Sequence, residues 1–345
     1  MANFLTQSIS GTYNGQEFTE VLFAPQEGSD DLAGIRVIPN IKVKANMYLN
    51  STLTKIVRKY STCGFAATGG VTNISDRTLE VAKLKVNLEE CGDAFYGTIF
   101  EEFYGAGTAI DDLTDTVVGD VARRRVAEAI ADDNGRIAWF AASSSANADF
   151  NQFDGFIQHF VTDSASLGQY ATMASTGPIA NVEDTAGVLV ADGAYELLKY
   201  AYENQTKVLR QVPNSMKSFR VTATIIDNLM TTYEQLGTGN ALGLQLLKDG
   251  QSLSFRGIPV IEVAGWDTQL ADANNPNSSG NGINIGANMM VYTVNDNLVV
   301  GTDVTDPASQ LKFRSNDDDD ELLKIIAKYK MGTQFVFGEL ISFYY

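Results

Sequence analysis

The sequence contains few of the residues that catalytic and metal sites use most. It has one histidine, His159, and two cysteines, Cys63 and Cys91, among 345 residues. A Ser-His-Asp or Cys-His arrangement would have to include His159, and no Gly-x-Ser-x-Gly turn is present to expose a nucleophile. Because His159 lies beside Phe156 and Phe160, we expect a packed structural histidine. One histidine and two distant cysteines lack the spacing of a zinc site. We therefore predict no catalytic, cofactor-binding or metal-binding residue.

Long apolar runs are absent as well. No stretch of 18 apolar residues occurs, so we expect no membrane-spanning helix and no membrane partner. Residues 1–8 lack a basic start followed by an apolar run, so we expect no secretory signal. In a reducing cytosol Cys63 and Cys91 would remain buried thiols rather than form a disulfide. The four Asn-x-Ser/Thr sequons are then chance matches.

Basic residues are scarce relative to acidic ones. The chain has 25 Lys and Arg against 42 Asp and Glu, a net charge of −17. Phosphate neutralisation needs clustered basic side chains, so the balance argues against tight DNA or RNA binding by the chain as a whole. The same sign suits a surface that lies near nucleic acid without adhering to it. With 44% hydrophobic residues the chain is a folded protein, and its length suits about two packed units.

Two segments and two separate aspartates resemble parts of binding or catalytic sites. The acidic run Asp317–Glu321 could attract cations, but it lacks the EF-hand spacing and central glycine, so we expect a solvated turn between two strands. Asp303 and Asp306 have no partner that the sequence identifies. The segment 237–243 resembles part of a dinucleotide loop but follows a helix instead of a strand, so we reject it.

A cluster of tyrosines on one predicted helix allows two interpretations. Tyr195, Tyr200 and Tyr202 lie near Lys199 and Lys207, as in a platform for stacked bases. At helical spacing these rings are more typical of a core edge or a subunit contact. We prefer the second interpretation.

Short β-type segments separated by turn residues dominate the last third of the chain. They are rich in β-branched and aromatic residues. The expected strands are 252–256, 258–263, 289–294, 297–300, 322–330, 334–337 and 340–345. The chain thus ends in sheet, with an apolar terminus that must be buried.

Helical periodicity is clearest in the middle of the chain. The longest expected helix covers 112–142, with Asp112 as N-cap, and is a rod of about 45 Å. Gly119 and Gly135 weaken it, each by about 1 kcal/mol relative to alanine. Further helices are expected at 93–104, 192–211 and 222–237, and a loop from about 158 to 184.

The first 92 residues combine a polar segment with strands. Residues 1–34 are polar and rich in turn residues, so this segment is either mobile or lies along a neighbour. Strands are expected at 35–38 and 41–43, a short amphipathic piece around 53–59, and a turn at 68–72. Leu84, Val86 and Leu88 alternate with polar residues, which predicts a half-buried strand. Phe219–Val221 is a further short strand.

The order of these elements resembles the major capsid proteins of tailed phages with the Hong Kong 97-like fold. The sharpest local likeness is Leu253-Ser-Phe-Arg-Gly-Ile-Pro-Val-Ile261, similar to an axial-domain strand of that family, and 295–303 is similar to the segment where the chain leaves that domain. The resemblance implies an α+β fold. Its parts would be an N-terminal arm (1–34), an extended loop (35–92), a peripheral domain (93–184) with the spine helix at about 112–142, an axial α/β domain (185–300), and strands returning to the peripheral domain (301–345).

The resemblance also implies a function, a location and a set of partners. The chain would assemble with itself into pentamers and hexamers of an icosahedral virion shell in the bacterial host cytoplasm. It would enclose double-stranded DNA without sequence-specific contact, and the further partners would be a portal and separate scaffolding or decoration proteins. Some relatives crosslink a loop lysine to a neighbour. Lys42, Lys44, Lys83 and Lys85 lie in that region, but no reactive pattern accompanies them, so we predict no crosslink.

Two structural alternatives remain open from the sequence. An encapsulin-like nanocompartment shell has the same fold and encloses protein cargo instead of a genome. A phage tail or surface-layer protein is compatible with the β-rich end of the chain. A hydrolase is a more distant alternative.

Overall fold

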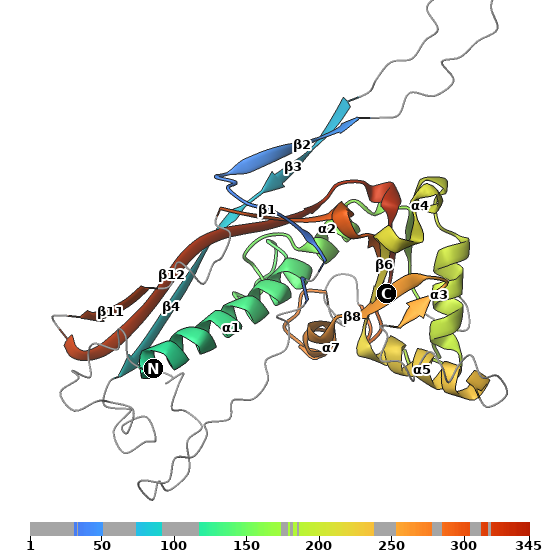
Figure 1. The fold of residues 1–345 in the computed structure, drawn as a ribbon. Helices are drawn as coiled ribbons and strands as arrows, with labels where there is room; N and C mark the ends of the chain where they lie inside the picture. Colours follow the sequence, from blue (N-terminus) through green and yellow to red (C-terminus); the bar gives the residue numbers. More distant parts are fainter. Residues whose placement is uncertain are drawn as a thin grey trace, which may run out of the picture.

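The computed structural model describes residues 31–32, 34–50, 74–91, 117–173, 179, 182–184, 186–237, 253–277, 285–303, 312–316 and 319–345. These residues form an elongated molecule with a long ribbon at one end, a mixed helix-and-sheet body at the other, and a hairpin that projects between them (Figure 1). The strands are β1 (Arg36–Ile38), β2 (Lys44–Asn50), β3 (Ile74–Glu80), β4 (Ala82–Cys91), β5 (Gln169–Ala171), β6 (Lys217–Val221), β7 (Ser254–Phe255), β8 (Ile258–Glu262), β9 (Met290–Val294), β10 (Leu298–Thr302), β11 (Lys312–Asn316), β12 (Asp319–Phe335) and β13 (Ile341–Tyr344).

The helices are mostly short, with one long exception. The α-helices are α1 (Val117–Phe140), α2 (Phe156–Thr162), α3 (Gly193–Glu203), α4 (Lys207–Gln211), α5 (Ala223–Gly237) and α7 (Ala264–Ala271). The 3-10 turns are η3 (Ser164–Ser166), η4 (Asn214–Met216), η5 (Asn295–Asn297) and η7 (Gly338–Leu340). In the described part of the predicted long helix, α1 has 24 residues and ends at Phe140 instead of 142. Asp112 and the predicted helix at 93–104 lie outside the described residues.

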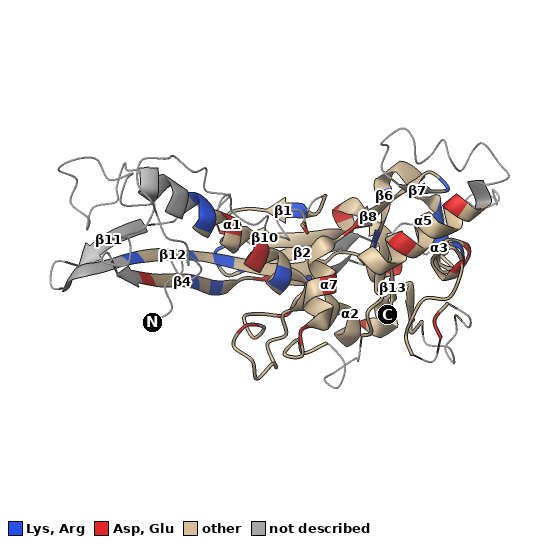
Figure 2. Cartoon of the chain, turned by 90° about the horizontal axis from the view of Figure 1, so that it is seen from below, with Lys and Arg blue, Asp and Glu red and all other residues tan. Residues whose placement is uncertain are grey.

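The ribbon is formed by β12 and its neighbours. The strand order is β1-β10-β12-β11, and β4 pairs antiparallel with β12 from Leu322↔Cys91 to Met331↔Ala82. α1 covers one face of the ribbon, where Tyr329 donates a hydrogen bond to Asn134 Oδ1 at 2.6 Å (Figure 2). The alternation predicted for Leu84, Val86 and Leu88 is confirmed, because these residues pack against the α1 core while their neighbours point away.

A second sheet has two cores, one on each of its faces. Its strand order is β5-β13-β9-β6-β8-β7. On β13, Phe343 lies in the core that α1, α2 and the ribbon share, whereas Tyr344 lies in the core under α3 and α5. Val291 and Tyr292 alternate in the same way on β9. Central strands that are apolar on both faces belong inside a layered body.

The placement of β13 corrects one sequence-based expectation. Residues 301–345 were expected to be strands that return to the peripheral domain. β10 and β12 do lie in the ribbon sheet, but β13 pairs antiparallel with β9 and parallel with β5. The apolar terminus was correctly expected to be buried, and it lies in the six-stranded sheet. β13 is buried along its whole length, and a position between two cores supplies apolar contacts to both faces.

The predicted helix 192–211 is two helices. α3 ends before Asn204, and α4 begins after Thr206, whose side chain accepts a hydrogen bond from the Leu209 N–H at 3.2 Å. Threonine is a good N-cap, and its bond starts a new helix axis. Val208 leaves the predicted buried face as a result and is 46% exposed. The predicted stop before Pro213 is confirmed.

Several other boundaries also differ. The expected loop at 158–184 contains most of α2, together with η3 and β5. Residues 41–43 are not a strand, and β2 begins at Lys44. The separate strands expected at 322–330 and 334–337 are one strand, β12, which starts within the acidic run. The helix expected at 222–237 and the strand at 219–221 are confirmed as α5 and β6.

The point where the N-terminal segment joins the body is well defined. Asp31, expected in the arm, is buried: its carbonyl accepts a hydrogen bond from Trp139 Nε1 at 3.2 Å and its carboxylate one from the Gly265 N–H at 3.3 Å. The buried guanidinium of Arg220 lies nearby, and burial lowers its pKa to about 10 while the charge of Asp31 opposes the shift. Asp31, the first described residue, is therefore packed against the body of the protein.

Candidate functional site: the base of the projecting hairpin

β2 and β3 form a two-stranded hairpin that projects from the body (Figure 1). The pairing runs from Lys44↔Glu80 at the base to Asn50↔Ile74. A two-stranded ribbon is marginally stable by itself in water. Its orientation must therefore come from contacts at the base, where β3 meets β12, η3 and the end of α2.

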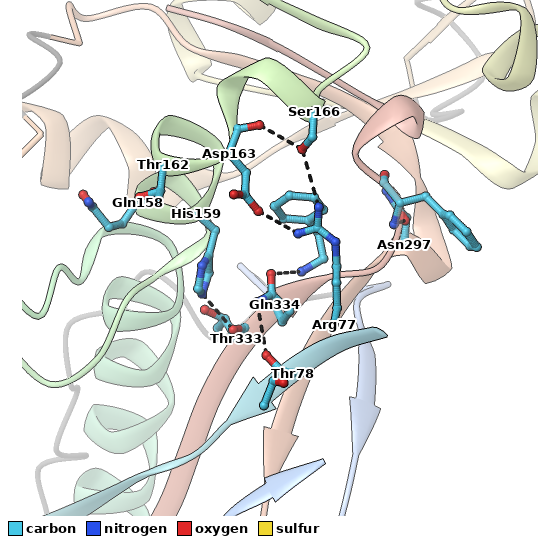
Figure 3. Close-up of polar contacts among 12 residues, drawn as sticks. Arg77, Thr78, Gln158, His159, Thr162, Asp163, Ser166, Asn297, Thr333 and Gln334 are labelled. Atoms are coloured by element: carbon cyan, nitrogen blue, oxygen red, sulfur yellow. Dashed lines mark hydrogen bonds and ion pairs between the residues drawn. The ribbon is translucent and has the colours of Figure 1, made fainter. Parts of the chain in front are cut away.

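Arg77 is the central residue of this base. Its Nη1 donates to Asp163 Oδ2 at 2.8 Å, its Nη2 approaches Ser166 Oγ at 3.5 Å, and its guanidinium lies over the ring of Phe335 at 4.0 Å (Figure 3). Arg77 is 20% exposed, but Asp163 is 43% exposed, so solvent screens the ion pair. Together the ion pair and the cation–π contact stabilise the joint by roughly 1–2 kcal/mol.

A small apolar cluster supports the same joint. Leu79 of β3 is fully buried, and the buried members of the cluster are Ile41, Leu79, Val81 and Val299. Gln334 on β12 donates to the Thr78 carbonyl at 3.3 Å (Figure 3). The backbones of β12 and the hairpin meet closely at Gly332, where a Cβ would lie 1.9 Å from the Glu80 carbonyl oxygen. Only glycine permits this approach.

His159 lies behind this joint and has a structural role. Its Nε2 is 2.9 Å from the carbonyl oxygen of Thr333, and Thr333 Oγ1 donates to the Asp154 carbonyl at 2.8 Å (Figure 3). Burial lowers the pKa of His159 from its ordinary value of 6.5, while Asp154 and Asp163 oppose the shift. A neutral ring that donates from Nε2 to the carbonyl fits these contacts. The imidazole thus joins α2 to β12, in agreement with the packed histidine expected from the sequence.

An open groove of about 890 Å³ runs between the hairpin base and η3. Its walls carry Arg77, Asp163, Ser166 and Thr206, and Arg77 and Asp163 are already paired with each other. Thr206 donates to the Glu339 carbonyl at 2.7 Å. These interactions hold elements together and leave no activated nucleophile among the described lining residues. What the arrangement can do is fix the direction in which the hairpin leaves the body.

The other residues considered from the sequence lie elsewhere. Asp303 accepts a hydrogen bond from the Lys330 backbone N–H at 2.7 Å. Cys91 ends β4, and the acidic run lies where β11 and β12 join, with Asn316 paired to Asp319. Asp319–Glu321 therefore lie in strand β12 and not in the expected turn, and residues 317 and 318 lie outside the described residues. Cys63, Asp306 and 238–243 lie outside the described residues.

The tyrosine cluster forms the edge of a core. Tyr195, Tyr200 and Tyr202 are partly buried and pack against the core under α3 and α5. Tyr195 meets Phe255 with ring centroids 5.7 Å apart, and Tyr200 meets Tyr344 at 6.2 Å. The preferred interpretation of these rings is therefore supported.

The described residues lack two features that a metal site or a membrane anchor would need. They contain no group of three or more His, Cys, Asp or Glu side chains placed to hold a metal ion. In the same residues, no helix is long and apolar enough to cross a membrane. The sequence did not indicate the base of the hairpin, because Arg77 lies in a strand, β3, that the sequence pattern did not predict. In the sequence Arg77 stands between Asp76 and Thr78, which gives no apolar alternation to mark a strand.

No protein-family model and no curated protein matches the chain. Solved structures do match it over nearly its whole length. A chain from the capsid of a native GTA particle has a TM-score of 0.60 at 14% identity, covering 100% of this chain and 99% of that chain. A chain from Gordonia phage Cozz has a TM-score of 0.55 at 14% identity, covering 99% and 94%. A chain from the capsid of cyanophage P-SCSP1u has a TM-score of 0.54 at 14% identity, covering 99% and 93%.

These likenesses establish the class of fold. The protein has a mixed helix-and-sheet fold that it shares with phage capsid chains. The resemblance noted in the sequence is confirmed at this level, because its structural neighbours are chains of phage capsids.

Proposed function

We propose that this protein is the major capsid protein of a tailed phage or of a related phage-like particle. The observation that carries the proposal is the match to a capsid chain over 100% of this chain and 99% of the other. We also propose the Hong Kong 97-like description of the parts, with β2–β3 in the extended loop, α1 as the spine helix and the β6–β9 sheet in the axial domain.

The shape of the molecule supports this role. The hairpin projects from the body, and the ribbon extends away from the six-stranded sheet, so both present strand edges and faces at the periphery of the molecule (Figure 1). Such edges are suited to pairing with adjacent copies. In a closed shell each subunit makes several moderate contacts, and closure makes the whole more stable than any pair.

Partners and location follow from this role as parts of the same proposal. The subunit assembles with itself into pentamers and hexamers of an icosahedral shell around double-stranded DNA, which it contacts without sequence specificity. A portal and separate scaffolding or decoration proteins complete the particle. Assembly takes place in the bacterial host cytoplasm, and the mature location is the virion capsid. The net charge of −17 limits adhesion between the shell and its DNA.

Microscopy of the purified full chain tests the proposal. We expect closed, uniform shells in negative-stain images and a fast sedimenting species, either from the chain alone or after co-expression with a scaffolding protein. A strictly monomeric species under every condition would contradict the proposal. Shells with protein cargo and no DNA would identify a nanocompartment, and tubes or flat lattices would identify a tail or surface-layer protein.

A further inference from the structure

A second groove, of about 860 Å³, lies on another side of α2 from the hairpin base. Gln158 and Val161 line it from α2, whereas His159 of the same helix bonds to β12 at the hairpin base (Figure 3). Among the described lining residues, the groove has none in common with the one beside η3. Its volume is in the range of about 300–1,000 Å³ that small-molecule sites occupy. It is therefore large enough for a ligand of a few rings.

The described residues that line this groove all have uncharged side chains, so we call it the uncharged groove. Charged residues make up 19% of the chain, yet the lining consists of serines, amides, small apolar residues and two tyrosines. The carboxylate of Asp272, beside the groove in sequence, is engaged in a turn and accepts a hydrogen bond from the Asn274 N–H at 2.8 Å. A groove without a lining cation cannot neutralise a phosphate or carboxylate ligand. Its ligand is therefore neutral.

Two tyrosine rings supply apolar surface to the uncharged groove. The rings of Tyr170 and Tyr345 have centroids 5.3 Å apart, and both pack on Phe343 of β13, at 5.9 and 5.5 Å. Both tyrosines are half-buried, so part of each remains accessible. Burial and a hydrogen bond with Tyr345 raise the pKa of Tyr170, which keeps its hydroxyl neutral. A fixed aromatic ring offers a flat apolar face on which the CH groups of a sugar ring can stack.

Amide groups accompany these rings. Asn147, Gln158, Asn274 and Asn277 line the groove from three separate segments of the chain. The side chains of Gln158 and Asn274 form no hydrogen bond with another described residue. Asn277 is only 2% exposed, its Nδ2 donates to the Phe140 carbonyl at 3.3 Å, and no described residue donates to its Oδ1. An amide holds a donor and an acceptor side by side, which suits two adjacent hydroxyl groups of one ligand.

The two loops that carry most of these amides are already fixed by hydrogen bonds. The Ser145 N–H donates to the Ala142 carbonyl at 2.9 Å, and the Asn147 N–H donates to Ser145 Oγ at 3.2 Å. In the other loop, the Asn277 N–H donates to Asn275 Oδ1 at 3.0 Å. A ligand therefore binds without a large entropy cost for ordering the groove.

We propose that the uncharged groove binds a short neutral oligosaccharide. The tyrosine rings stack on the apolar face of a sugar, and the amides of Gln158, Asn274 and Asn277 bind its hydroxyl groups. A purely apolar ligand would leave these amides without partners. A protein partner fits less well, because the groove is bounded by fewer residues than the roughly 20–30 on each side of a stable protein interface.

Saturation-transfer NMR with the full chain tests the proposal. The probes are maltotriose, cellotriose and triacetylchitotriose, which are neutral, and trigalacturonate as an anionic comparison. We expect saturable transfer to at least one neutral probe, strongest at its CH protons when the aromatic protons of the protein are saturated. Trigalacturonate should give no transfer.

Matched amide variants locate the binding site. Gln158→Ala with Asn274→Ala removes two groove amides, and the dissociation constant of the bound probe should rise about tenfold, the effect of two lost hydrogen bonds. The control, Asn87→Ala with Gln211→Ala, removes two exposed amides on β4 and α4 and should leave that constant unchanged.

Three results would overturn the proposal. They are no transfer to any neutral probe at millimolar concentration, stronger transfer to trigalacturonate than to the neutral probes, and equal loss of affinity in both double variants. Negative-stain images of the same samples report separately on the proposed function. All residues of the groove belong to one chain, so binding without closed shells would support this inference and count against the capsid role.

Discussion

At the scale of single residues, Arg77 links the hairpin to the body through an ion pair with Asp163 and a ring contact with Phe335. Replacing it with alanine removes both interactions without creating a clash. We expect Arg77→Ala to lower the free energy of unfolding by about 1–2 kcal/mol and to speed hydrogen exchange in β3.

The control for this prediction is another arginine in an ion pair. Arg124 pairs with Glu128 on α1 at 3.1 Å and is 79% exposed. Arg124→Ala should change stability by less than about 0.5 kcal/mol. Equal effects of the two substitutions, measured by urea unfolding, would show that the base of the hairpin contributes no special stability.

His159 makes stability depend on pH in a defined direction. Its burial holds the pKa in the folded protein below the ordinary 6.5. The unfolded chain therefore takes up the proton first, and the folded state loses stability as pH falls from 6.5 toward the lower folded pKa. Because the chain has one histidine, its ring signal in proton NMR can be assigned without ambiguity.

The corresponding measurement compares wild type with His159→Gln. The free energy of unfolding of wild type should fall between pH 7.5 and pH 5.5, and the variant should show a smaller change over the same interval. A folded pKa at or above 6.5 in the NMR titration would contradict this explanation of the histidine.

At the scale of elements, the close approach of β12 to the hairpin depends on Gly332. A Cβ there would lie 1.9 Å from the Glu80 carbonyl oxygen, so Gly332→Ala must displace one strand. We expect Gly332→Ala to lower the free energy of unfolding by about 1–3 kcal/mol. Gly286→Ala is the matched control, because an added Cβ has no heavy atom within 4 Å. Thermal unfolding of both variants measures this difference in stability. Similar melting temperatures would show that the close approach at Gly332 contributes nothing to stability.

At the scale of the whole molecule, the six-stranded sheet joins the two cores through β9 and β13. Phe343 is fully buried, with ring centroids 5.5 Å from Phe160 and 5.9 Å from Tyr170. Phe343→Ala should lower the free energy of unfolding by about 3–5 kcal/mol. Because both cores share the sheet, we expect one unfolding transition, and its midpoint temperature should fall in the variant.

The exposed aromatic ring of Phe337 provides the comparison. It is 45% exposed, so Phe337→Ala should cost well under half as much. Calorimetry shows whether the protein unfolds in one transition or in two. Two separate transitions, of which only one moves in Phe343→Ala, would mean that the cores unfold independently.

Local patterns were sufficient for part of this architecture. Apolar residues at helical spacing identified α5, and alternation identified the buried face of β4, because these periods belong to single elements. The break between α3 and α4 was missed, since the Thr206 cap competes with an otherwise continuous helical pattern. The base of the hairpin was missed for a different reason. Arg77, Asp163 and Phe335 are far apart in the sequence and meet only through the tertiary fold.

The sequence by itself determined the scarcity of catalytic side chains, the acidic balance, the apolar end of the chain and the order of elements that resembles phage capsid proteins. These properties depend on residue types and on contacts within single elements. The tertiary structure alone decided that β13 lies between two cores, that Arg77 orients the hairpin, and that Lys83 and Lys85 lie opposite Lys330 and Lys328 in the ribbon. Strand register decides each of these, and register depends on residues that are distant in sequence and must pack against one another.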